Sequence, residues 1–433
     1  MNRREEAKQL RYEKKYEDAI NIYKKIWEEE IKKGNIDIWL SWEYADSLKK
    51  NGNIDCAIDI CKQTYYSYPK AKINNNLLSW CLYEKYIKNI LSENITPNNV
   101  DDIVEFITKN ASNNKFSAYE TSVFRMIEYY EKKENNPQKV KYWIEKVDKE
   151  TLSEAPYEYE NSKIEGASRK EKWYFSKIKC LYKLGEYDEC IEVCNEAIET
   201  INNFHYDSDI WILLYKAKSL YNKSKEEKMQ AIKIIEELIK KKRQWHFYYE
   251  LAQMYNEINI NKTRENLLQA LILYSDDKEI KMKTKAIYML AEILEASDEK
   301  MALKHYCFYY NIREKEVWKI SQTLVNKINI LKQKTGLDNV NVSYKELRQY
   351  WIRLYIKEST RFEGKIIKIF GKHKDRGVIR VDNKEIYFAV KSFLYRPKTT
   401  LLNKNVEFNI IKSYDKKKKE ESEEAINILL GGK

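Results

Sequence analysis

Three short segments near the C-terminus, 364–370, 376–381 and 384–390, alternate apolar with basic or aromatic side chains. Alternate side chains of an extended strand point to opposite faces, so each segment is expected to bury one set and expose the other. The residues expected to point inward are Ile367, Gly377, Ile379, Ile386 and Phe388. Exposed cations neutralise phosphates and exposed rings stack on bases, which is the chemistry of single-stranded nucleic-acid binding. The candidate contact residues are Lys368, Phe370, Lys372, Lys374, Arg376, Arg380, Tyr387 and Phe393.

The positive charge of the chain is concentrated at the same end. The 433-residue sequence holds 79 Lys and Arg against 67 Asp and Glu, a formal net charge of +12. Residues 341–433 carry 22 of these cations against 12 acids, whereas residues 1–340 are nearly balanced at 57 against 55. Such an asymmetry favours an anionic partner for the C-terminal region, most commonly nucleic acid, although basic chains also occur for solubility alone.

Catalytic or metal-binding patterns are not found in the sequence. The four histidines, His205, His246, His305 and His373, are isolated, and there is no phosphate-binding glycine loop, HExxH motif or paired CxxC frame. His305 and Arg313 are spaced to share a helix face two turns apart, for which a packed or surface pair is the simpler interpretation. We therefore expect a non-enzymatic protein with no cofactor and no bound metal.

The composition predicts a cytoplasmic, mainly helical chain. Gly (10) and Pro (5) are scarce while Lys, Glu, Ile, Asn and Tyr abound, which favours long helices. No segment offers the roughly 18 consecutive apolar residues that a membrane-spanning helix needs, and no apolar stretch follows the basic N-terminus. The seven cysteines are expected to be reduced thiols, with Cys56, Cys61, Cys190 and Cys194 on the buried face of helices.

Three segments repeat the same spacing of bulky and small residues. They are Tyr16, Ala19, Tyr23 and Ile26; then Gly52, Ile54, Ala57, Cys61 and Thr64; then Gly185, Tyr187, Cys190, Cys194 and Ala197. Spacings of three and four place these side chains on one helix face, where a small residue such as Ala57 lets a neighbouring helix approach closely. Each copy is expected to be the second helix of a hairpin. The pattern, closed by Pro69 in the second copy, resembles the tetratricopeptide repeat over about residues 1–320.

The resemblance implies a solenoid of helical hairpins over residues 1–335, because one hairpin cannot bury its own apolar stripe. It also implies a protein partner on the concave face of the repeats. Residues 91–170 keep helical runs without the small residues, so we expect a degenerate stretch there. A bridging helix is expected at 341–360, since Ser343 precedes Glu346 by three residues and apolar residues follow at helical spacing.

Residues 361–433 are expected to form a small β-barrel. Five short segments rich in Ile, Val, Phe and Tyr, at 364–370, 376–381, 384–390, 405–411 and 425–430, read as strands. The charged run 415–421 between the last two is expected to be a solvated hairpin tip. The first three strands resemble the opening of a cold-shock domain, and the match continues to about residue 431. The resemblance implies an OB-fold whose outward aromatics stack on single-stranded bases.

The sequence departs from the cold-shock pattern at four places. Arg376 and Val378 occupy aromatic positions of the second strand, Ile369 stands for a Trp, and Ala389 stands for a His. Much of the usual stacking platform is therefore missing. Arginine planes also stack on bases and contact phosphates, so the face retains the chemistry for weak binding.

These patterns predict a mainly α protein with a tetratricopeptide-like solenoid and a C-terminal OB-fold barrel. We expect a non-enzymatic adaptor that binds a protein partner through the repeats and RNA or single-stranded DNA through the barrel. The alternative is a purely protein-interacting scaffold whose barrel is structural or a docking module. Helical repeats joined to such a barrel resemble accessory components of bacterial nucleic-acid or conflict systems, and the Lys, Ile and Asn bias is typical of an AT-rich bacterial genome.

Overall fold

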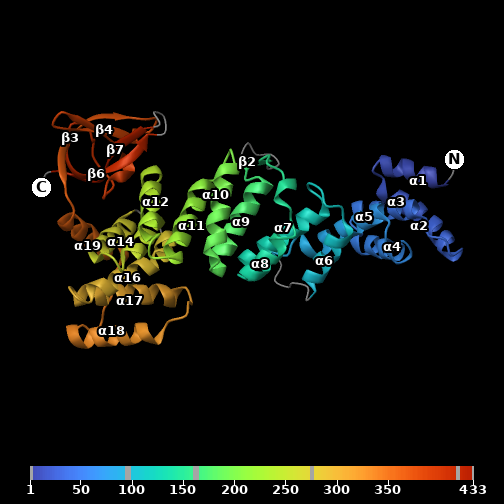
Figure 1. The fold of residues 1–433 in the computed structure, drawn as a ribbon, viewed down its shortest axis with the longest axis horizontal. Helices are drawn as coiled ribbons and strands as arrows, with labels where there is room; N and C mark the ends of the chain where they lie inside the picture. The colour runs from blue at the N-terminus through green and yellow to red at the C-terminus, as the bar shows by residue number, and fades with distance from the viewer. Residues whose placement is uncertain (1–2, 93–98, 159–164, 274–276, 416–419, 432–433) are drawn as a thin grey trace. The chain divides into compact units, whose positions relative to one another are not determined.

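The computed structural model describes residues 3–92, 99–158, 165–273, 277–415 and 420–431. The chain is mainly α-helical and ends in a closed five-stranded barrel, as the sequence predicted (Figure 1). Contacts divide it into two compact units, residues 1–215 and 216–433, and the boundary falls inside helix α11 (Ser208–Lys223). None of the helices in the described ranges is both long and apolar enough to cross a membrane.

In the first unit, consecutive helices pack against one another along the chain. The helices before α11 are α1 (Arg3–Tyr12), α2 (Tyr16–Lys32), α3 (Ile38–Lys50), α4 (Ile54–Ser67), α5 (Lys72–Leu82), α6 (Val100–Asn110), α7 (Ala118–Lys132), α8 (Pro137–Ile144), α9 (Arg169–Leu184) and α10 (Tyr187–Thr200). A π-helical turn, Tyr83–Ile87, continues α5. The two-residue strands β1 (Tyr157–Glu158) and β2 (Glu165–Gly166) pair antiparallel. The expected degenerate stretch therefore contains α6, α7 and α8 as regular helices.

The small residues of the repeated pattern lie in the core. Ala19, Ala57 and Cys190 are completely buried on α2, α4 and α10, which confirms the predicted packing faces. Gly185 ends α9 in the left-handed conformation, with φ 78°, and its N–H donates to carbonyls of the last turn. That conformation suits glycine, and it allows the next helix to begin two residues later at Tyr187.

The prediction for Cys56 was wrong. Cys61, Cys190 and Cys194 are buried, whereas Cys56 is exposed. Ala57 and Cys61, four residues apart, define the buried face of α4, and Cys56 lies about 100° around the helix from Ala57. The periodicity of the helix therefore directs the Cys56 thiol to solvent.

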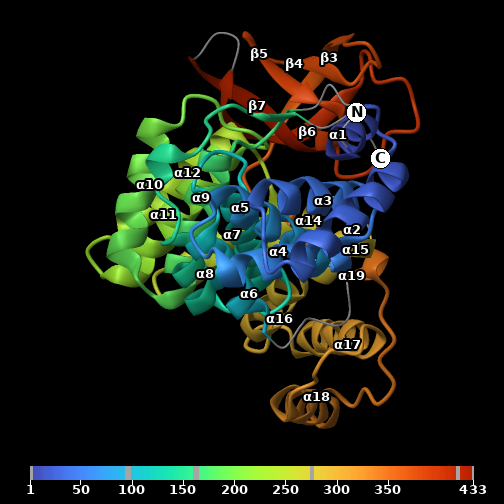
Figure 2. The same cartoon turned by 90° about the vertical axis from the view of Figure 1, so that its right-hand side faces the viewer.

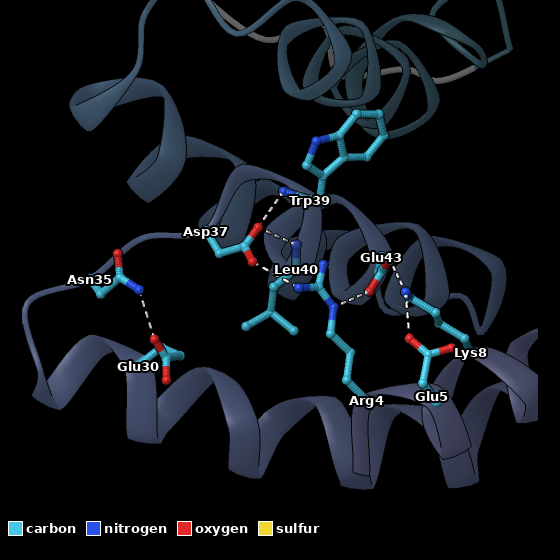
Figure 3. A network of polar contacts seen from close by, with 9 residues as sticks. All are labelled: Arg4, Glu5, Lys8, Glu30, Asn35, Asp37, Trp39, Leu40 and Glu43. Atoms are coloured by element: carbon cyan, nitrogen blue, oxygen red, sulfur yellow. Dashed lines mark hydrogen bonds and ion pairs between the residues drawn. The ribbon is translucent and has the colours of Figure 1, made fainter. Parts of the chain in front are cut away.

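An ion-pair network fastens α1 to the start of α3, and Figure 3 shows its side chains. Arg4 bridges two acids, with Nη1 2.7 Å from Asp37 Oδ2 and Nε 3.0 Å from Glu43 Oε2. Asp37 also caps α3 by accepting hydrogen bonds from the N–H groups of Trp39 and Leu40. Because Glu43 is buried, its pairing with Arg4 offsets the cost of removing that carboxylate from water.

The second unit begins in α11, and its described residues before the barrel form further helices and a bridging helix. They are α12 (Lys228–Lys241), α13 (Trp245–Tyr255), α14 (Ile260–Ile272), α15 (Asp277–Met282), α16 (Thr284–Leu294), α17 (Glu299–Lys315), α18 (Gln322–Thr335) and α19 (Tyr344–Glu358). Helix α19 matches the predicted bridging helix, and Ser343 caps it by accepting from the N–H of Glu346. It packs against α14, so it belongs to the helical layer as well as leading into the barrel.

The barrel contains each of the five predicted strands. They are β3 (Phe362–Phe370), β4 (Arg376–Val381), β5 (Lys384–Ala389), β6 (Asn405–Asp415) and β7 (Glu420–Leu430). The closed order is β3-β4-β5-β7-β6, with β5 and β7 parallel and the other pairs antiparallel. Its core is apolar and includes Ile366, Ile379, Phe388 and Phe408, all completely buried. Residues 416–419 of the expected hairpin tip lie outside the described residues.

Polar contacts connect the start of the barrel to β6 and β7 and join the barrel to α19. Arg361, just before β3, donates from Nη1 to Asn409 Oδ1 at 2.7 Å and to the carbonyl of Asn427 at 2.9 Å. Arg348 of α19 donates to the carbonyl of Leu394 at 2.8 Å. Figures 1 and 2 both place α17 and α18 on the opposite side of this unit from the barrel.

Candidate nucleic-acid interface

Strands β3, β4 and β5 carry the candidate residues in neighbouring rows across the sheet. The first row is Lys368, Val378 and Tyr387, and the second is Phe370, Arg376 and Ala389. Directly paired residues of neighbouring strands point to the same face of a sheet. Lys368, Arg376 and Tyr387 are exposed and Phe370 is half-buried, so the register brings these four side chains together on the outer face of the barrel.

A β-bulge changes the phase of β3, and the prediction that Ile367 points inward was wrong. Ile366 pairs with Ile379 and is completely buried, whereas Ile367 is half-buried and the register shifts between Ile366 and Lys368. One extra residue in a strand resets its alternation. Lys368 consequently points outward as expected, and the inward positions Gly377, Ile379, Ile386 and Phe388 are confirmed as buried.

Two aromatic rings form the centre of this face. The centroids of Phe370 and Tyr387 lie 6.2 Å apart, with the rings tilted by 51°. Tyr387 is 38% exposed, and the Nζ atom of Lys368 lies 5.9 Å from the centroid of the Phe370 ring. Partial burial raises the pKa of the Tyr387 phenol, so the ring is neutral at physiological pH. A neutral exposed ring beside a cation is a surface on which a base can stack.

The cations around these rings differ in how far they are already neutralised. Arg380 forms an ion pair with Glu385 at 2.7 Å, and both side chains are exposed. Arg376 lies 3.7 Å from Asp375, a looser pair that leaves most of its donors to solvent. Lys368 has no ion-pair partner among the described residues. Lys368 and Arg376 therefore carry charges that are less compensated by neighbouring acids than the charge of Arg380.

Lys372 and Lys374 lie in the exposed turn between β3 and β4. Gly371 adopts φ 95° and Lys374 adopts φ 54°, and the N–H of Lys374 donates to the carbonyl of Gly371 at 3.1 Å. A Cβ at position 371 would lie 2.1 Å from Asp375 Oδ1, so the turn requires glycine there. The turn holds both lysines at the end of the face that Phe370 and Arg376 border.

Phe393 does not belong to the exposed face, and its prediction as a contact residue was wrong. Its side chain is only 8% exposed and packs edge-on against Phe388, with ring centroids 5.9 Å apart. Phe393 also forms a parallel bridge with Ile428 of β7. The segment after β5 turns inward through a 3-10 turn at Val390–Ser392, which places the ring in the barrel core.

Two lysines beside the face were missed by the sequence analysis. Lys365 pairs with Arg380 across β3 and β4 and is exposed on the same outer face. Lys391 is exposed in the 3-10 turn that follows β5. In a regular strand, residues 365 and 368 would point to opposite faces, so Lys365 would point inward. The bulge between them places Lys365 on the outer face. Neither lysine has an ion-pair partner in the part of the chain that the structure describes.

A separate groove lies in the first unit between α7 and α9. Two adjoining cavities of about 430 Å³ and about 280 Å³ share Tyr157, Arg169 and Lys172 in their walls. Arg169 pairs with Glu120 at 3.1 Å, and its guanidinium lies 4.8 Å from the centroid of the Phe124 ring. Burial lowers the pKa of Lys172, whose Nζ lies 5.1 Å from the centroid of the Tyr157 ring. Aromatic walls with cations at the junction suit a segment that carries acidic and apolar side chains.

His305 and Arg313 do not interact with each other. His305 is completely buried, and its Nδ1 donates to the carbonyl of Met301 at 2.6 Å while Nε2 accepts from the indole of Trp351 at 2.7 Å. Arg313 donates to the carbonyl of Lys319 at 2.7 Å. Burial lowers the pKa of His305 to about 4, so the ring is a neutral structural bridge. Across the described ranges, no group of three or more His, Cys, Asp or Glu side chains is placed to hold a metal ion.

Comparison with solved structures finds similarity to helical-repeat proteins. A human IFIT1 dimer with PPP-AAAA is 14% identical, over 81% of this chain and 78% of that one, with a TM-score of 0.36. A Rap protein complexed with competence and sporulation factor is 12% identical, over 74% of this chain and 87% of that one, also at 0.36. No protein-family profile and no curated protein matches the chain. Identities and TM-scores this low assign neither a family nor a ligand.

Proposed function

We propose that this protein is a non-enzymatic adaptor that binds single-stranded RNA or DNA through the barrel and a protein partner through the concave face of its helical repeats. The observation that carries the first half is the outward pair of rings, Phe370 and Tyr387, set among Lys365, Lys368 and Arg376. Rings alone are common on surfaces, and so are cations. Their juxtaposition on one curved sheet is the arrangement that stacks bases while neutralising the phosphates between them.

The barrel architecture supports the same proposal. OB-fold barrels have five strands and bind oligonucleotides on the face of the second and third strands and in the loop between the first two. In this barrel those strands are β4 and β5, and that loop holds Lys372 and Lys374. The candidate residues thus occupy the positions that an OB-fold uses, and we propose that the barrel is a cold-shock-like member of that class.

The rows also set the expected strength of binding. Val378 and Ala389 lie in the two rows where further rings would extend the stacking surface. Within these two described rows the rings are those of Phe370 and Tyr387, and each stacked base contributes roughly 1–3 kcal/mol. Most of the remaining affinity must come from phosphate contacts, so binding is expected to be modest, tolerant of sequence and strongly dependent on salt.

The groove between α7 and α9 supports the protein-binding half of the proposal. Tyr157 and Phe124 offer aromatic contact area, and Lys172 has no ion-pair partner among the described residues. A partner segment with an acidic side chain next to an apolar one would neutralise Lys172 and cover the rings. The test uses a partner that binds the repeats of the parent protein when both are purified. The double variant Phe124→Ala and Lys172→Glu should bind that partner more weakly than the parent does.

A second candidate function is a scaffold in which the barrel is structural. The hydrogen bonds of Arg348 in α19 to the carbonyl of Leu394 and of Asn427 in β7 to Gln269 in α14 favour it, because they join the barrel to the helices of its unit. Such integration fixes the barrel without assigning it a ligand. The two functions differ in one property, which is binding of single strands by the outer face.

Fluorescence anisotropy with labelled 20-nucleotide uridine and thymidine strands separates these functions. We expect the full chain to bind both strands. The double variant Phe370→Ala and Tyr387→Ala should bind more weakly, because it loses roughly 1–3 kcal/mol of binding free energy for each base that no longer stacks. Tyr395→Ala is the matched control, since Tyr395 is 47% exposed after the buried Phe393–Leu394 segment rather than in the rows. Equal binding by the double variant and the parent, with both folded, would favour the structural scaffold.

A further inference from the structure

The C-terminal end of α12 brings a run of four cations to the barrel. Residues 240–243 are Lys, Lys, Lys and Arg, and they cover the last turn of α12 and the residues just after it. Helix α12 packs against β6, and Lys240 forms an ion pair with Glu421 of β7 at 3.3 Å (Figure 1). Lys240 also pairs with Glu237 of α12 at 2.5 Å, so it is shared between its own helix and β7. The packing of α12 on β6 and the ion pair with Glu421 place the C-terminal end of α12 beside the β6–β7 hairpin.

Glu424 of β7 links this run to the ring-bearing face. Glu424 pairs directly with Tyr387 across β5 and β7, so its half-buried side chain lies on the same face of the sheet as Tyr387. Burial raises the pKa of Glu424, and the charges of Arg243 from the end of α12 and of Lys391 from the turn after β5 act on that pKa in the opposite direction. Two cations from different elements therefore border the same acid at the edge of the two aromatic rows.

These cations are available to a ligand. Lys241 and Lys391 are exposed, Arg243 is half-buried, and none of the three has an ion pair within 4.0 Å among the described residues. A lysine run at a helix end is ordinarily a solvated terminus. Here the ion pair of Lys240 with Glu421 and the pairing of Glu424 with Tyr387 both lie on β7, so the end of α12 lies near the row that contains Tyr387.

We propose that the nucleic-acid face of the barrel continues across β7 onto the end of α12, where Lys241 and Arg243, with Lys391, hold the backbone of the same single strand. This inference rests on the proposed function. Strands β3, β4, β5 and β7 are consecutive in the barrel, and neighbours lie about 4.8 Å apart, so the rows and the α12 end form one path for an extended strand. Bases stack on Phe370 and Tyr387, and phosphates then meet the cations beyond Glu424.

The position of Glu424 makes the proposal testable by changes of opposite sign. Glu424 is a carboxylate on the path of a polyanion, so Glu424→Gln should strengthen binding by roughly two- to fivefold at low salt. The double variant Lys241→Gln and Arg243→Gln should weaken binding. A damaged fold would weaken binding, so it could not explain stronger binding by Glu424→Gln.

The measurement is the salt dependence of uridine and thymidine 20-mer binding by the full chain. Each phosphate contact on a single strand contributes about 0.7 to the slope of log K against log salt, so the Lys241 and Arg243 double variant should reduce the slope by about 1.4. The matched control is Lys300→Gln with Lys315→Gln, two exposed lysines of α17 on the side of the unit opposite the barrel. We expect that control to keep the slope of the parent.

Failure of this inference is distinguishable from failure of the proposed function. If the parent binds and loses affinity with Phe370→Ala and Tyr387→Ala, but the α12 double variant keeps the full slope, the face ends at the barrel and the run is a solvated terminus. Weaker binding by Glu424→Gln would also overturn the path across β7. If the parent binds neither strand at low salt, the proposed function and this extension fail together.

Discussion

Acidification should destabilise the second unit through His305. The ring is completely buried between α17 and α19, with Nδ1 donating to Met301 and Nε2 accepting from Trp351. A second proton would have to be placed on Nε2, which would break the bond from the indole and leave a charge in the core. The folded protein therefore resists protonation of a group that titrates readily in the unfolded chain.

The size of the effect follows from the two pKa values of His305. Its pKa falls from 6.5 to about 4 on folding because of burial. Between these values the unfolded chain binds a proton that the folded chain does not, so stability is full above pH 6.5 and is lost as pH falls toward 4. From pH 7.5 to pH 4.5, this residue alone should lower the free energy of unfolding by roughly 2.5 kcal/mol.

Urea unfolding read by pulsed hydrogen exchange and mass spectrometry isolates the unit that contains His305. Peptides from α17 and α19 report its unfolding at pH 7.5, 6.0 and 4.5 in the full chain. The variant His305→Gln cannot titrate; it should be less stable at pH 7.5 and lose roughly 2.5 kcal/mol less than the parent on acidification. An identical loss in parent and variant would refute the assignment of His305 as a buried neutral bridge.

Three further changes test the packing of the chain. Ala57→Trp should overpack the contact of α4 with its neighbours and lower the free energy of unfolding by roughly 1–3 kcal/mol, so an unchanged urea midpoint would contradict the buried face. Gly377→Ala should destabilise the barrel by a similar amount, as seen in thermal melts, because its Cβ would lie 2.5 Å from the Phe388 ring. Native protein should expose one fast-reacting thiol to Ellman's reagent, Cys56, and Cys56→Ser should abolish that phase, since the other six cysteines are buried.

The helical part was predictable because its signal is local. Side chains three and four residues apart share a helix face whatever surrounds them, so Ala19, Ala57 and Cys190 could be assigned to the core from spacing alone. The same reasoning placed the bridging helix, since Ser343 and Glu346 form the start of a helix by themselves. Cys56 was misplaced because it was grouped with Cys61 by residue type rather than by its angle around the helix.

The errors in the barrel arose where position depends on distant parts of the chain. The bulge beside Ile366 is set by the pairing of β3 with β4, and no pattern within β3 marks it, so Ile367 was assigned to the wrong face and Lys365 was missed. Phe393 is drawn into the core by its bridge to Ile428, a residue 35 positions further along the chain. In the segment after β5, the sequence pattern does not distinguish an exposed aromatic residue from a buried one.

The long-range polar contacts of the barrel could not be predicted from the sequence either. From the sequence, Arg361 would be expected to be an exposed cation. In the structure it donates hydrogen bonds to Asn409 and Asn427. From the sequence, the cations at the end of α12 are expected to form a solvated helix terminus. The structure shows that Lys240 forms an ion pair with Glu421. In each case the partner is at least 48 positions away, so only the folded chain assigns the side chain to a site.

The most direct test of the central proposal is to identify the residues that a bound single strand contacts. Ultraviolet crosslinking of the full chain to a uridine 20-mer at low salt, followed by mass spectrometry, identifies the contacted residues without any substitution. We expect adducts on Phe370 and Tyr387, in peptides from β3 and β5, that disappear as salt is raised. Adducts confined to the helices of residues 1–215, or none at saturating strand concentration, would contradict it.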